Sequence, residues 1–246
     1  MSRNTLRRSA FPSAATLALA VMVIAATTAL AAGKPGYPTR VTWGGGSWQV
    51  KTSTSAVGPG PCVFAAANVN VDTAGFIHLR ISQQAGRWTC AEVIGPTSHG
   101  YGTYSFTIAS SLAEFDPNAV LGLFTWSDRA RYAHREIDIE VAKWGNAADT
   151  TNAQFVVQPW DASNHLYRFS EPGGTRTLQA FTWRKGEITW VATDPSTGVE
   201  IASYRYQGAD VPIPGDERVR LNLWLFNGSA PAAPAEVVVE SFAFTP

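Results

Sequence analysis

The chain has 246 residues, of which 45% are hydrophobic, 11% aromatic and 15% charged. This is enough apolar sequence for one large β domain with a substantial core. The formal net charge is zero, which argues against a nucleic-acid partner or an anionic membrane surface.

The first 31 residues have the layout of a secretory signal peptide. Arg3, Arg7 and Arg8 form a basic start, residues 14–30 carry no charge, and Ala29-Leu30-Ala31 has the small-residue spacing of a cleavage site. We therefore expect a signal peptide over 1–31, a single domain over 32–246, and a secreted or periplasmic protein that leaves the membrane after cleavage. The apolar run is long, so an uncleaved anchor is the alternative.

The chain contains two cysteines, Cys62 and Cys90. In an exported chain an even number of cysteines favours a disulfide, and we expect these two to be bonded to each other. A zinc site is not indicated, because no further cysteine and no paired histidines accompany them.

Beyond the signal, short apolar runs bounded by turn residues predict an all-β domain of two antiparallel sheets. No segment has a helical stripe of useful length. In chain order, strands are expected at 68–71, 76–82, 103–108, 120–126, 135–142, 154–157, 181–184, 187–193, 199–206, 219–226 and 237–244.

The segment at 135–142 carries an unusual row of acids. In a strand, Ile137 and Ile139 face the core, whereas Glu136, Asp138 and Glu140 face the other way, about 7 Å apart from one to the next. Like charges in a row repel, so a solvated face leaves them without compensation. A Ca²⁺ ion usually draws its ligands from a loop. Acid–base chemistry on a sugar needs two carboxyl groups in different protonation states, and crowding separates their pKa values.

The string EIDIE at 136–140 resembles the catalytic signature of glycoside hydrolase family 16, which includes lichenases, laminarinases and agarases. Other elements resemble that family in the same order along residues 40–246. They are FTW at 124–126, FTW at 181–183 followed by EITW at 187–190, and LNLW at 221–224.

This resemblance implies a concanavalin A-like β-jelly-roll sandwich with a sugar cleft across its concave face. It implies a retaining endo-β-glycanase that hydrolyses a β-linked polysaccharide, with a β-glucan favoured. Glu136 would be the nucleophile, Glu140 the general acid/base and Asp138 the assisting carboxylate. Gln179 stands where the family commonly has a histidine, which predicts a different contact near the nucleophile.

Several aromatic and amide residues are candidates for substrate binding, because sugar rings stack on aromatic faces and amides in apolar strands need partners. Core packing and structural hydrogen bonding are the ordinary alternatives for each. The candidates are Trp126, Trp144, Gln154, Gln158, Trp160, Asn222 and Trp224.

Two other functions stay open: a lectin-like carbohydrate-binding module on the same sandwich, and a transglycosylase that uses the same residues. No cofactor or catalytic metal is expected, and the sequence leaves a structural Ca²⁺ open. The expected partner is the polysaccharide alone, bound by a monomer. The four histidines show no ligand spacing and are expected at the surface or in loops.

Overall fold

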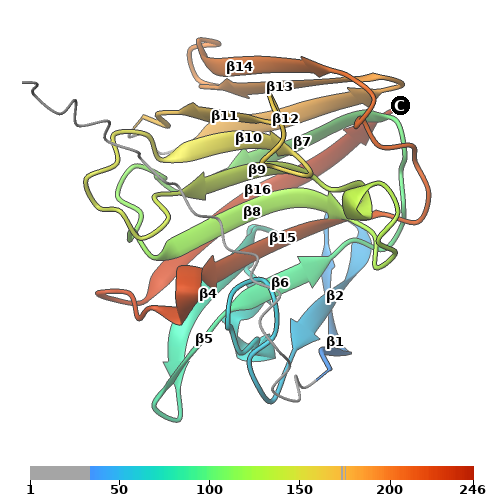
Figure 1. Ribbon diagram of the computed structural model, residues 1–246. Helices are drawn as coiled ribbons and strands as arrows, with labels where there is room; N and C mark the ends of the chain where they lie inside the picture. The colour runs from blue at the N-terminus through green and yellow to red at the C-terminus, as the bar shows by residue number, and fades with distance from the viewer. Residues whose placement is uncertain (1–33, 173, 175) are drawn as a thin grey trace, which may run out of the picture.

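A computed structural model describes residues 34–172, 174 and 176–246, so the predicted signal peptide lies outside the described residues. These residues form two antiparallel sheets (Figure 1). The first sheet has the order β1 (Gly36–Trp43), β2 (Gly46–Thr52), β6 (Ala91–Ile94), β15 (Arg218–Leu225), β8 (Ala119–Trp126), β9 (Ile137–Ala142), β10 (Ala153–Val157) and β11 (Leu166–Phe169).

The second sheet has the order β14 (Glu200–Gln207), β13 (Glu187–Thr193), β12 (Thr177–Arg184), β7 (Gly102–Ile108), β16 (Ala235–Thr245), β4 (Ile77–Gln84) and β3 (Val69–Val71), with β5 (Arg87–Thr89) paired to β4. The remaining elements are short 3₁₀ turns at Ala66–Asn68, Ala133–Arg135 and Phe226–Gly228.

The predicted fold class, all-β with two antiparallel sheets, is confirmed. Every predicted strand coincides with a strand of the structure, and the largest difference is at β12, which begins at Thr177 rather than at 181. No helix in the described part of the chain is long and apolar enough to cross a membrane.

The core lies between the two sheets. Alternation along β9 turns Ile137 and Ile139 inward, and both are fully buried, as are Leu221 and Leu223 of β15. The second sheet contributes large aromatic side chains to the same core. The indole nitrogen of Trp190 donates to the backbone oxygen of Asp138 at 3.1 Å, which ties the acidic strand to the opposite sheet.

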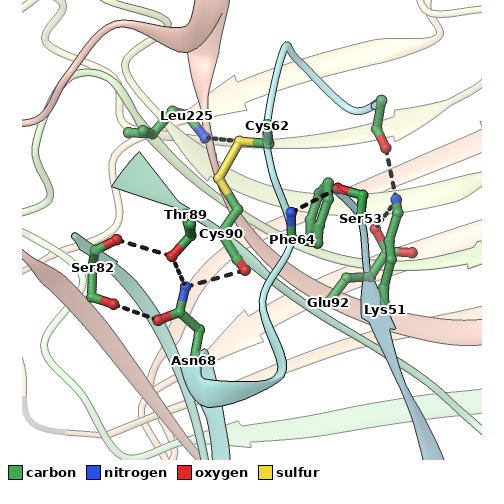
Figure 2. Close-up of a disulfide and its surroundings, with 11 residues drawn as sticks. Lys51, Ser53, Cys62, Phe64, Asn68, Ser82, Thr89, Cys90, Glu92 and Leu225 are labelled. Carbon is green, nitrogen blue, oxygen red and sulfur yellow. Dashed lines mark hydrogen bonds and ion pairs between the residues drawn. A yellow bond between two sulfur atoms is a disulfide. The ribbon is translucent and has the colours of Figure 1, made fainter. Parts of the chain in front are cut away.

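The expected disulfide is confirmed: Cys62 is bonded to Cys90, across 28 residues of sequence (Figure 2). The backbone nitrogen of Leu225, at the end of β15, donates to the sulfur of Cys62 at 3.2 Å. Beside the bridge, the amide of buried Asn68 donates to Thr89 Oγ1 at 2.9 Å. The bridge therefore fastens the loop before β3 to β6 and β15, next to the first sheet.

Candidate active site

The acidic residues lie on the outer face of the first sheet, the face turned away from the core. Strand β9 begins at Ile137, and Glu136 lies just before it, after the 3₁₀ turn at Ala133–Arg135, so the predicted start at 135 is wrong. The backbone oxygen of Glu136 still accepts from the nitrogen of Gln158 at 3.2 Å, which keeps it in line with β10. Strands β8 and β10 flank β9, so neighbouring side chains on this face come from both.

Asp138 joins the first two members of the row. Its side chain is hydrogen-bonded to that of Glu136, and Gln158 Nε2 donates to Asp138 Oδ2 at 3.3 Å. Burial, followed by the charges of Glu136 and Glu140, raises the pKa of Asp138 well above its usual value. Asp138 therefore keeps its proton and donates a hydrogen bond to Glu136. This hydrogen bond favours the ionised form of Glu136.

Glu140 is held by an amide whose orientation is fixed. Gln154 Nε2 donates to Glu140 Oε2 at 2.7 Å. The oxygen of the same amide accepts from Trp144 Nε1 at 3.2 Å and from Arg168 Nη1 at 3.0 Å. Two donors on the oxygen leave the amide one orientation, with its NH₂ group towards Glu140. Arg168 itself is paired with Asp149 at 2.7 Å.

The surroundings keep protons on this group of carboxyls up to neutral pH. Burial, and then the charge of Glu140, raises the pKa of Glu136 to about 8. Burial raises the pKa of Glu140 to about 7, against the opposing effects of Gln154 and Arg168. The effect of Glu140 on Glu136 is the second largest on that residue, so the two glutamates interact although a straight strand would separate their Cα atoms by about 13 Å.

Asn222 and Gly122 lie in the same cross-strand row as Glu140. Asn222 pairs with Gly122 of β8, and Gly122 pairs with Glu140 of β9. Asn222 is 2% exposed, and its Oδ1 has no hydrogen-bond partner among the described residues. A Cβ at position 122 would lie 2.5 Å from that oxygen, so the glycine leaves room for the amide.

Trp126 and Trp144 are half-buried and lie on either side of the acids. Trp126 stacks on the ring of His134, with centroids 4.2 Å apart. Trp144 packs against Trp224, whose side chain is 8% exposed, and donates to Gln154 as described. Trp160 meets the site through its backbone, since its nitrogen donates to Gln158 Oε1 at 3.0 Å.

An ionic cluster, buried except for Asp128, adjoins these residues on the same face. Lys51 of β2 pairs with Glu92 of β6 at 2.8 Å, and Arg220 of β15 pairs with Glu92 at 3.2 Å and with Asp128 at 2.9 Å. The positive charge of Arg220 also lowers the pKa of Glu136. These four residues and Arg168 cannot be recognised from the sequence, because only strand pairing brings β2, β6 and β15 next to one another and β11 next to β10.

One expectation is wrong. Gln179 lies in the core, where its Nε2 donates to Glu171 Oε2 at 2.9 Å, so it does not supply a contact to the nucleophile. His165 lies in the loop before β11, as expected of the histidines, and its side chain is buried there. Its Nδ1 donates to the oxygen of Pro159 at 2.7 Å and its Nε2 is bonded to the hydroxyl of Tyr206 at 2.8 Å. His165 therefore anchors the segment that carries Gln158 and Trp160.

Comparison with known proteins supports the fold. No family model matches the chain, and no curated protein matches it by sequence. Solved structures do match: a β-glucanase of Bacillus licheniformis is 21% identical, with a TM-score of 0.63 over 87% of this chain and 99% of that one. The chain has the fold of that β-glucanase.

Two further structures agree with this assignment. A β-1,3-1,4-glucanase (lichenase) from a mouse hindgut metagenome is 24% identical, with a TM-score of 0.62 over 81% of this chain and 92% of that one. A laminarinase from Flavobacterium sp. UMI-01 is 11% identical, with a TM-score of 0.62 over 86% of this chain and all of that one. The glucanase fold is the concanavalin A-like β-jelly-roll sandwich that the sequence predicts.

Proposed function

We propose that this protein is a retaining glycoside hydrolase of the family 16 type, which cleaves a β-linked polysaccharide with a glucan backbone. The observation that carries the proposal is the row of Glu136, Asp138 and Glu140. These three carboxyl groups lie side by side on one face of the glucanase fold, and burial raises the pKa of all three. A solvated face would not retain protons near neutral pH, whereas hydrolysis of a glycosidic bond requires a carboxylate and a carboxylic acid together.

Each residue has a role in a double displacement. Glu136, ionised and accepting the hydrogen bond of Asp138, attacks the anomeric carbon while Glu140 protonates the leaving glycosidic oxygen. Glu140 then takes a proton from water, and that water attacks the same carbon and releases Glu136. Gln154 positions Glu140, because its amide is held by Trp144 and Arg168.

The substrate would lie across the strands of the outer face, over the acids. Asn222 offers a buried amide oxygen that no described residue uses, and Gln158 offers an amide beside Asp138. Trp126, Trp144, Trp160 and Trp224 supply the aromatic surface near these polar groups. An amide and an aromatic face are the combination that binds sugar hydroxyls and sugar rings.

The proposal includes export, since disulfides persist in oxidising compartments and Cys62 is bonded to Cys90. The predicted signal peptide over 1–31 agrees with this location.

Reducing-sugar release from lichenan, laminarin, agarose and carrageenan tests the proposal. Wild-type protein should release sugar from a β-glucan, and Glu136→Gln should abolish the release. Glu140→Gln should lose about 10²- to 10⁴-fold on the polysaccharide, the usual contribution of a general acid, but less on an aryl glycoside whose leaving group needs no proton. Asp138→Asn should fall between wild type and Glu136→Gln.

Two results would contradict parts of this assignment. Wild-type turnover in Glu136→Gln would refute hydrolysis at this site, and retained sugar binding would then point to a lectin. Inversion at the anomeric carbon of the first product, seen by NMR, would refute the nucleophile role alone.

A further inference from the structure

Basic side chains gather on the outer face of the first sheet, from β15 towards the β1 end. Arg40 of β1 pairs with Gln49 of β2, Gln49 with Ile94 of β6, and Ile94 with Arg220 of β15. Residues paired in this way point to the same side of a sheet. Arg218, two residues before Arg220, is on the same face, as is Lys51, two residues after Gln49.

The charges in this region do not balance. Lys51 and Arg220 are neutralised by Glu92 and Asp128 (the Lys51–Glu92 pair is visible in Figure 2). Arg40 and Arg218, in contrast, have no carboxylate within 4 Å among the described residues.

The two arginines make hydrogen bonds to neutral groups instead. Arg218 donates to Gln49 Oε1 at 2.7 Å, and Arg40 donates to the oxygen of Ser47 at 3.4 Å. Four cations therefore face two anions, which leaves two positive charges.

These positive charges repel one another. Burial lowers the pKa of the Arg218 guanidinium, and the charges of Arg220 and Arg40 lower it further, against the opposing effects of Asp128 and Tyr37. The Nε of Arg220 is also buried and has no hydrogen-bond partner in the described part of the chain. The whole chain has a formal net charge of zero, so this excess is local and does not reflect a basic protein.

We propose that Arg40 and Arg218 bind acidic groups, carboxylates or sulfates, on the polysaccharide, at sites removed from the bond that is cleaved. The order of strands places Arg218 and then Arg40 at increasing distances from the acids, on the same side of β9. Strands lie about 4.8 Å apart, so β15 is about 10 Å and β1 about 24 Å from β9. A glycan lying across the strands over the acids therefore passes over both arginines.

The same geometry excludes an acidic group from the reacting sugar. An anion beside Glu136 and Glu140 would meet two carboxyls whose own charges already interact unfavourably. Further along the sheet it would meet guanidinium groups, which bind carboxylates and sulfates through charge-assisted hydrogen bonds. The substrate class is therefore a β-linked polysaccharide with acidic substituents. This substrate assignment depends on the proposed function, but binding of the anion does not require hydrolysis.

Binding by the inactive Glu136→Gln protein tests the inference. The probes are one soluble β-1,3-1,4-glucan in three forms: unmodified, carboxymethylated and sulfated. We expect the Kd for at least one acidic form to be about tenfold lower than that for the unmodified glucan, which corresponds to one charge-assisted contact. The carboxymethylated and sulfated forms distinguish which acidic group is bound. High salt should remove the difference, because the Debye length at 1 M is about 3 Å.

Two variants locate the effect. Arg40→Gln with Arg218→Gln should remove most of the preference for the acidic form. Arg40→Gln alone, at an exposed side chain, should reduce it and tests the idea if the double variant does not fold. The control is Arg87→Gln: Arg87 is also exposed and donates to one backbone oxygen, that of Thr54 at 3.5 Å, but it lies on β5 of the other sheet's network. It should keep the full preference.

Equal Kd values for the three forms would overturn the inference, and so would a preference that the double variant keeps. These outcomes are separable from failure of the proposed function. If wild-type protein hydrolyses the unmodified glucan but shows no preference, only the inference fails. If it hydrolyses none of the three forms, the proposed function fails, and the Kd comparison still decides whether the arginines bind anions.

Discussion

Asp138 determines how protons are shared among the three carboxyls. It lies between the glutamates, is 3% exposed, and has contacts with both Glu136 and Gln158. A carboxyl that stays protonated behaves as a hydrogen-bond donor, so Asp138 supports an ionised neighbour without adding a second negative charge beside it. The row therefore carries less charge than its three carboxyls suggest.

The pKa values of the two glutamates predict the pH dependence of hydrolysis. Glu136 must be ionised and Glu140 protonated, and their pKa values are raised to about 8 and about 7. The state with one proton between them is most abundant between pH 7 and 8. Because the pKa of Glu136 is the higher, the catalytic arrangement with the proton on Glu140 is the minor form of that state, but it follows the same pH dependence, so kcat/KM should be bell-shaped with its maximum there. A pH–rate profile on a soluble β-glucan measures this. A maximum near pH 5 would show that the carboxyls titrate at ordinary values and are not shifted by burial.

At the scale of strands, Gly122 separates two functional side chains. It lies between Asn222 and Glu140 in one cross-strand row, and its missing side chain leaves space for the Asn222 amide. In Gly122→Ala the new Cβ would lie 2.5 Å from Asn222 Oδ1, so the amide must move. We expect kcat/KM on β-glucan to fall about tenfold, the value of one hydrogen bond, with little loss of stability.

The matched control for that prediction is the same glycine substitution in an Asn222→Ala background. With the amide already removed, Gly122→Ala should lower kcat/KM little further. If Gly122→Ala alone has wild-type kinetics, Asn222 does not need its present position to bind substrate.

The disulfide ties together two segments that are distant in the sequence. It joins the loop before β3 to the residue preceding β6, and closing a loop of 28 residues contributes about 3 kcal/mol by restricting the unfolded chain. Cys62→Ser with Cys90→Ser should therefore lower the free energy of unfolding by about that amount, as measured by urea denaturation. Reduction of the wild-type protein should give a similar loss, whereas unchanged denaturation would show that the bridge does not constrain the unfolded state.

Local sequence patterns predict most of the strands but not all of them, nor how they pair. β7 alternates Tyr104, Phe106 and Ile108 inward and was recognisable, as was the chemistry of the row at 136–140. The strands β1, β2, β5, β6 and β11 are not among those predicted. β1 and β2 form a local hairpin whose turn is Gly44-Gly45, whereas β6 pairs with β15, more than 100 residues further along the chain, so no short window contains that pairing. The ionic cluster of Lys51, Glu92 and Arg220 depends on this pairing and was missed with it.

On the scale of the whole molecule, two groups of carboxyls act on stability in opposite directions. Asp72, Asp194 and Asp216, which are half-buried or exposed, have lowered pKa values, chiefly from hydrogen bonds to His78, Ser196 and Ser127. Their stabilising effect is present above the unfolded pKa and is lost as the pH falls through the folded pKa. Loss of this effect therefore destabilises the folded state only at acidic pH.

The carboxyls with raised pKa values act at the other end of the pH range. Glu136, Glu140 and Glu171 keep their protons to about pH 8, 7 and 7, whereas in the unfolded chain they ionise near 4.5. The folded state binds more protons over this interval, so stability is fully present below about pH 4.5 and falls as the pH rises to 8. Together the two groups place maximum stability near pH 4, between the unfolded pKa values of the aspartates and the glutamates and below the expected pH of maximum activity.

Glu171→Gln separates this effect from catalysis. Burial raises the pKa of Glu171, and its partner is Gln179 in the core, away from the acidic row. Between pH 5 and pH 8 the free energy of unfolding should fall by on the order of 2 kcal/mol more in the wild-type protein than in the variant. The amide of the variant does not ionise and still pairs with Gln179, so only the contribution of this carboxyl is removed. Urea denaturation at the two pH values measures the difference, with β-glucan hydrolysis as the control that the site is intact. An equal pH dependence in both proteins would mean that Glu171 ionises at the same pH in the folded and unfolded chain.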